Sequence, residues 1–103
     1  MQVFAALADP TRRRIVELLA ERDYPAGELA GRFSLSQPAV SQHLRTLRDA
    51  GLVRVRRDAQ RRIYAVDPRG LAEIDTWLAH CRRFWNSHLD ALENALTQGD
   101  PND

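Results

Sequence analysis

The sequence predicts a small, mainly α-helical domain with one β-hairpin. Apolar residues recur at helical spacing in several capped segments, and two short arms near residue 60 alternate between apolar and polar residues. A long apolar stripe with heptad-like spacing follows these arms. The 103 residues suffice for a single domain, which we place at residues 1–98, followed by a frayed tail at 99–103.

The composition excludes several classes of protein. Hydrophobic residues make up 44% of the chain and charged residues 28%, which is typical of a soluble globular protein. No apolar run approaches the roughly 20 residues of a membrane span, and the first residues do not resemble a signal peptide. The single cysteine, Cys81, leaves no intrachain disulfide and no multi-cysteine zinc site. We therefore expect a cytoplasmic protein that does not associate with membranes.

Two helices are expected in the first twenty residues. Apolar residues within 3–7 predict a short opening helix. Asp9 is a favoured N-cap and Pro10 a favoured first helical residue, so a second helix is expected from about 10 to 20. Arginines 12–14 occupy its first turn, where the helix dipole disfavours cations. This conflict indicates that at least one of them has a partner elsewhere in the protein.

The next two helices have the spacing of a helix-turn-helix. A loop at 23–25 precedes a short helix over 26–32, a tight connection follows over 33–36, and a second helix runs over 37–50. Ser36 caps this second helix, and Gly51 ends it in the left-handed conformation.

The second helix of this pair has two faces. Val40, Leu44 and Leu47 recur at i, i+4 and i+7 and are expected to face the core. The opposite face carries amide, hydroxyl and guanidinium groups, which pair with base edges in the major groove of DNA. A solvated amphipathic helix is the alternative interpretation. The residues of this outer face are Gln37, Ser41, Gln42, Arg45 and Arg48.

Arginine residues concentrate around the predicted hairpin, whose arms are 52–57 and 61–66. Residues 45–69 hold eight arginines against three aspartates, and the chain contains no lysine. Charges also protect exposed edge strands, but this excess of one sign favours a wing that lies along the phosphate backbone of DNA. Ser36 adds a helix N-terminus that suits a phosphate. The candidate phosphate-binding residues are Ser36, Arg12, Arg48, Arg54, Arg56, Arg57, Arg61 and Arg62.

A final helix of about 30 residues, about 45 Å long, is expected from residue 68. Its apolar stripe is too long for so small a monomer to cover, so we expect a homodimer in which this helix forms the interface. Trp77, Phe84 and Trp85 pack in that dimer or line a ligand pocket between the subunits. The interface residues expected on this helix are Leu71, Ile74, Trp77, Leu78, Cys81, Phe84, Trp85, His88 and Leu92.

Four segments carry a resemblance to a known family. Residues 6–13 (ALADPTRR), 27–30 (GELA), 35–44 (LSQPAVSQHL) and 47–53 (LRDAGLV) resemble, in this order, the ArsR family of bacterial winged-helix repressors. The resemblance covers nearly the whole chain. It implies a dimeric winged helix-turn-helix with a DNA-reading unit at about 10–66.

The resemblance also assigns roles to individual residues. The first and last helices of the family form the dimer interface, which places it here at 2–8, including Phe4, and at 68–97. By motif, Gln37, Ser41, Gln42 and His43 match positions that contact DNA in relatives. Because His43 borders the core face of its helix, a groove contact and a structural role both remain open. Together with Arg45, these are the predicted base-reading residues.

The chain departs from the family at the wing tip and at the metal sites. Ala59 stands where the wing usually has glycine. Residues 28–32 lack the Cys-x-Cys pattern of thiolate sensors, and residues 75–77 break the Asp-x-His pattern of last-helix zinc sites. His80, Cys81 and His88 remain, but they diverge around a single helix and do not converge as zinc ligands do. We therefore expect no metal or cofactor, with an intersubunit zinc site as the alternative.

These observations together predict a homodimeric DNA-binding transcription regulator, a repressor that occupies an inverted-repeat operator. The alternative is a ligand-, metal- or redox-responsive sensor whose DNA binding is switched at the dimer interface. The expected partners are double-stranded DNA and a second copy of the chain. An enzyme is not expected, because the sequence has no P-loop, dinucleotide-binding turn or nucleophile elbow.

Overall fold

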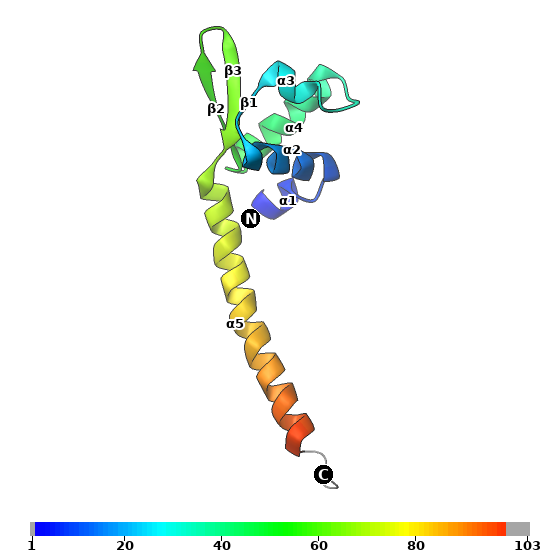
Figure 1. Ribbon diagram of the computed structural model, residues 1–103, viewed down its shortest axis with the longest axis vertical. Coiled ribbons are helices and arrows are strands. Elements are labelled where there is room, and N and C mark those ends of the chain that lie inside the picture. Colours follow the sequence, from blue (N-terminus) through cyan, green and yellow to red (C-terminus); the bar gives the residue numbers. More distant parts are fainter. Residues whose placement is uncertain (1, 99–103) are drawn as a thin grey trace. The chain divides into compact units, whose positions relative to one another are not determined.

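The computed structural model describes residues 2–98 and has the predicted mainly α-helical fold with a small antiparallel hairpin (Figure 1). The chain divides into two compact units, one up to residue 73 and one from residue 74 onward. The elements in chain order are α1 (Gln2–Ala6), α2 (Pro10–Glu21), β1 (Tyr24–Pro25), α3 (Ala26–Ala30), α4 (Gln37–Asp49), β2 (Val53–Asp58), β3 (Arg61–Val66) and α5 (Pro68–Gln98).

The helix ends follow the predicted capping residues. The Asp9 carboxylate accepts a hydrogen bond from the Arg12 backbone N–H at 3.0 Å, and this bond is the main cause of the lowered pKa of Asp9. Ser36 Oγ accepts from the Ala39 N–H at 3.2 Å. Gly51 has a φ of 78°, the left-handed conformation that ends α4. The predicted starts of α2 and α4 are therefore confirmed.

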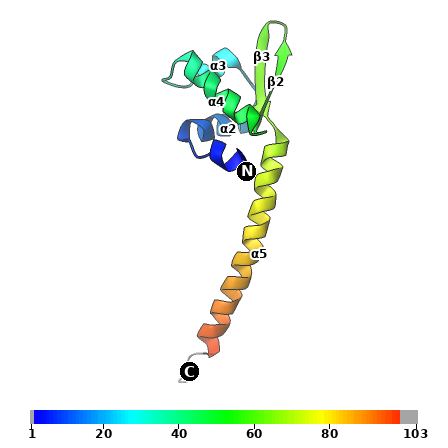
Figure 2. The same cartoon turned by 180° about the vertical axis from the view of Figure 1, so that it is seen from behind.

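The core of the first unit is formed by α1, α2, α3 and α4 together with the sheet (Figure 2). Val40, Leu44 and Leu47, the predicted core residues of α4, are at most 3% exposed. Ile15 of α2 and Leu29 of α3 are fully buried. This packing leaves the polar face of α4 directed outward.

The sheet has a third strand that the sequence did not reveal. The prediction of a loop at residues 23–25 is wrong in part, because residues 24–25 form strand β1. This strand pairs with β3, with Tyr24 opposite Tyr64 and Pro25 opposite Ile63. Tyr24 is 1% exposed, and Arg22 covers its ring with Cζ 3.7 Å from the ring centroid. A strand of two residues has no periodicity to recognise, so this pairing is visible only in the fold.

Helix α3 is shorter than predicted, ending at Ala30 rather than near residue 32. The Arg32 N–H bonds to the Leu29 carbonyl and the Phe33 N–H to the Ala30 carbonyl. These i→i+3 bonds tighten the chain into turns, which ends the α-helix early.

The wing tip is a two-residue turn between β2 and β3, and it contains a strained residue. Ala59 has a φ of 58°, a left-handed conformation that costs a residue with a Cβ about 1–2 kcal/mol. Glycine relieves this cost but loses more entropy on folding. We therefore expect Ala59→Gly to raise the free energy of unfolding by about 0.5–1 kcal/mol. Urea unfolding of the two proteins measures the difference, and a less stable variant would contradict the left-handed turn.

Candidate nucleic-acid interface

The outer face of α4 is polar and exposed. Gln37, Ser41, Gln42 and Arg45 are all exposed, as predicted for base-reading residues. Pro38, Ser41, Gln42 and Arg45 border a shallow hollow of about 400 Å³ that continues to Thr46 and Asp49. These side chains supply the amide, hydroxyl and guanidinium groups that recognise base edges.

The N-terminus of α4 has fewer free N–H groups than a typical helix start. Pro38 has no N–H, the Ala39 N–H is bonded to Ser36 Oγ, and the Val40 N–H is bonded to the Ser36 carbonyl. Within residues 37–40, only the Gln37 N–H is left for a phosphate. The predicted phosphate contact at Ser36 therefore depends on this single N–H and the exposed hydroxyl.

Arg12 lies between α1 and α4. Its Nε donates to the Ala6 carbonyl oxygen at 2.6 Å, and its Nη1 lies 3.4 Å from His43 Nδ1. The expected partner of an arginine at the start of α2 is thus found at the C-terminal end of α1. These contacts favour a structural role for both Arg12 and the half-buried His43, and their predicted DNA contacts stay predictions.

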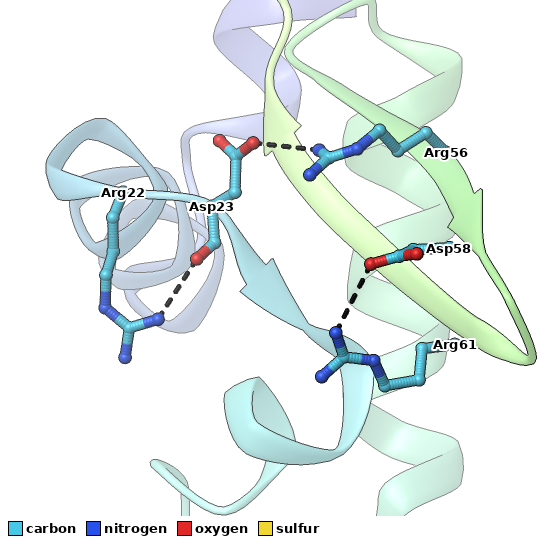
Figure 3. Close-up of polar contacts among 5 residues, drawn as sticks. All are labelled: Arg22, Asp23, Arg56, Asp58 and Arg61. Carbon is cyan, nitrogen blue, oxygen red and sulfur yellow. Dashed lines mark hydrogen bonds and ion pairs between the residues drawn. The ribbon is translucent and has the colours of Figure 1, made fainter.

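The arginines of the wing differ in their partners (Figure 3). Arg56 donates to Asp23 Oδ2 at 2.9 Å, and Arg61 donates to Asp58 Oδ2 at 3.3 Å. All four side chains are about half exposed. Asp23 was not identified from the sequence, because its contact spans 33 residues and no local pattern indicates it.

Arg54 lies on β2 and is farther from the wing tip, and nearer to the start of α5, than the other arginines of the wing. The pKa of the buried Asp67 carboxyl is lowered mainly by hydrogen bonds from Arg69, with a smaller contribution from the charge of Arg54. Arg69 Nη2 donates to Asp67 Oδ2 at 2.7 Å, and the Arg69 backbone N–H donates to Oδ1 at 3.0 Å. The Asp67 carboxylate therefore holds the first turn of α5 through Arg69.

Residues 74–97 of α5 carry an exposed apolar stripe. Phe84 and Trp85 are 62% and 59% exposed, and Leu92 is 56% exposed. An apolar hollow of about 470 Å³ lies on this helix and is lined by Leu78, His80, Cys81, Arg82, Phe84 and Trp85. The other predicted interface residues are Phe4 and Ile74, which are half-buried, and Leu71 and Trp77, which are about two-fifths exposed.

The possible metal ligands of α5 do not cluster. The ring of His88 stacks on that of Phe84, with the centroids 5.2 Å apart. Over the described residues, no group of three or more His, Cys, Asp or Glu side chains is arranged to hold a metal ion. None of the helices within residues 2–98 is long and apolar enough to cross a membrane.

The fold and the surface of α4 together define a winged helix-turn-helix protein of the DNA-binding class. Comparison with known proteins identifies the family. Residues 9–55 match the profile described as "Bacterial regulatory protein, arsR family". The chain is 45% identical over 100 residues to the HTH-type transcriptional regulator Rv2034 of Mycobacterium tuberculosis, covering 96% of this chain and 91% of the relative.

Two further relatives agree with this assignment. The transcriptional repressor SdpR of Bacillus subtilis is 37% identical over 76 residues, which cover 74% of this chain and 84% of the relative. An ArsR-like transcriptional regulator from Rhodococcus sp. RHA1 has a similar structure, with a TM-score of 0.75 and 31% identity over 90% of this chain and 88% of that one. The chain belongs to the ArsR family, and it is a DNA-binding transcriptional regulator rather than an enzyme.

Proposed function

We propose that this chain is a homodimeric repressor that binds an inverted-repeat operator in the bacterial cytoplasm. The observation that carries the proposal is the polar outer face of α4, whose opposite face is buried in the core. A helix anchored in this way presents a fixed row of side chains to the major groove. We assign base reading to Gln37, Ser41, Gln42 and Arg45, and phosphate contacts to the wing.

The exposed stripe of α5 supports the homodimer. Single apolar residues are common on protein surfaces, but a continuous stripe with several large aromatic side chains indicates a protein interface. Its heptad-like spacing fits a second copy of the same helix. We infer that α5, together with the region around Phe4, forms the dimer interface, while residues 10–66 contact DNA. A protein repressor of this kind prevents access to a promoter by occupying it.

The symmetry of such a dimer constrains the DNA site. Two α4 helices related by a two-fold axis contact two half-sites of opposite orientation, about 10 bp apart from centre to centre. We infer an inverted repeat with this spacing. The similarity to SdpR, a transcriptional repressor, supports repression as the outcome.

The role of α4 is tested by Gln42→Ala. We expect this variant to lose about 1–3 kcal/mol of binding free energy at particular base pairs, because an amide that pairs with a base edge has been removed. Its affinity for duplexes altered at those base pairs is expected to match that of the wild type. Fluorescence anisotropy with a selected duplex and its single-base variants measures both.

The matched control is Glu17→Ala on the exposed face of α2, outside the proposed interface. It should keep the wild-type preference at every position. If Gln42→Ala instead loses the same affinity for every duplex, α4 does not read base pairs through Gln42. This result would contradict the proposed function.

A further inference from the structure

The two faces of the wing differ in whether their arginines have carboxylate partners. In an antiparallel pair, residues directly opposite each other point to the same side of the sheet. Arg57 lies opposite Arg62, and the next pair toward the tip is Asp58 opposite Arg61. One face therefore places two cations together, whereas the other places a cation beside a carboxylate.

The face with Arg57 and Arg62 also approaches the end of the DNA-reading helix. Arg48, in the last turn of α4, lines a hollow of about 210 Å³ together with Arg57 and Arg62. The remaining lining residues are Val55 and Arg56, and the guanidinium of Arg56 is bonded to Asp23. Within the described residues, Arg48, Arg57 and Arg62 have no carboxylate partner, in contrast to Arg56 and Arg61.

This arrangement is unfavourable without an anion. Like charges directly opposite each other destabilise a strand pair, and a third guanidinium beside them adds to the repulsion. A position in the last turn of a helix favours a cation, which accounts for Arg48 by itself. The dipole of α4 does not account for two further arginines that face each other across the wing.

We propose that Arg48, Arg57 and Arg62 form a clamp for one phosphate of the DNA backbone. Arg56 and Arg61, whose charges Asp23 and Asp58 compensate, contribute little to DNA binding. This inference rests on the proposed function and refines it, because the sequence alone assigned the arginines of the wing to phosphate without distinguishing between its faces. Guanidinium groups suit this role because each offers several donors in a planar fork.

The test compares the two faces in their dependence on salt. Arg57→Ala, Arg62→Ala and Arg48→Ala are measured against Arg56→Ala and Arg61→Ala, which remove the same charge. The probe is a 30-bp duplex of mixed sequence, because a phosphate contact does not depend on base sequence. Anisotropy titrations from 50 to 300 mM KCl give the slope of log K against log salt.

The clamp predicts a different result for each face. Because the three arginines hold one phosphate together, the loss of any one of them should release it. Each clamp variant should then reduce the magnitude of the slope by about 0.9 per bound protomer, the value for one phosphate, which is about eightfold in affinity at 0.1 M relative to 1 M salt. Arg56→Ala and Arg61→Ala should change the slope by less than half of this amount. Arg57→Lys should keep most of the slope, because the charge remains. If Arg57→Ala fails to fold, Arg62→Ala reports on the same clamp from the opposite strand.

Two results would overturn the inference, and they are distinguishable. Equal losses from both faces, with wild-type binding intact, would reject the clamp and leave the proposed function in place. A wild-type protein that binds neither this duplex nor any selected duplex would reject the proposed function and the clamp with it.

Discussion

Replacing Trp85 with alanine is expected to convert the proposed homodimer to a monomer at micromolar concentrations. The side chain is 59% exposed in the single chain and lies in the middle of the apolar stripe of α5. Tryptophans at the centre of an interface commonly contribute about 2–4 kcal/mol, so the dissociation constant should rise about 30- to 1,000-fold. Analytical ultracentrifugation over a concentration series measures this constant.

The matched control for Trp85→Ala is Asp90→Ala. Asp90 is exposed on the same helix, on the side opposite the heptad-like stripe. Its removal should leave the dissociation constant within about threefold of the wild type, which is about 0.65 kcal/mol. A wild-type protein that is already monomeric at these concentrations, or a Trp85→Ala variant that dimerises normally, would contradict the α5 interface.

Replacing Gly70 with alanine is expected to destabilise the first unit by about 1–3 kcal/mol. Gly70 lies in the first turn of α5, and its N–H donates to the Gly51 carbonyl oxygen at 2.9 Å. A Cβ at Gly70 would lie 2.6 Å from that oxygen and 2.8 Å from Leu52 Cδ2. Helix propensity alone predicts the opposite, a gain of up to about 1 kcal/mol from glycine to alanine.

Gly27→Ala distinguishes steric conflict from helix propensity. Gly27 is in α3, and a Cβ there would meet no atom within 4 Å. This variant should be as stable as the wild type or more stable by up to about 1 kcal/mol. Urea unfolding midpoints of the two variants should therefore shift in opposite directions. A Gly70→Ala protein as stable as Gly27→Ala would show that the contact between Gly70 and residues 51–52 is not tight.

Local sequence signals were sufficient to predict most elements of the fold. Asp9, Ser36 and Gly51 act through neighbouring residues, so the ends of α2 and α4 could be predicted from the sequence. The buried stripe of α4 follows from its spacing in the same way. The pairing of Tyr24 with Tyr64 could not be predicted, because it joins residues distant in the sequence through only two strand positions.

The candidate interface was predictable in its residue types but not in its charge pairing. Clustering of arginine identified the wing, and the helical period identified the outer face of α4. Which arginines are paired depends on the strand register and on Asp23, which the fold brings to Arg56. Similarly, the sequence places the cation of Arg12 in the first turn of a helix, where the dipole disfavours it. The contact of Arg12 with the end of α1, which accounts for this position, is visible only in the fold.

Sequencing the genomic DNA fragments retained by the purified protein is the most direct test of dimeric operator recognition. The proposed function predicts enrichment of an inverted repeat whose half-sites lie about 10 bp apart, and loss of that enrichment in Gln42→Ala. Retention of fragments without a shared motif, or of a motif without two-fold symmetry, would contradict a dimer that reads DNA through two α4 helices.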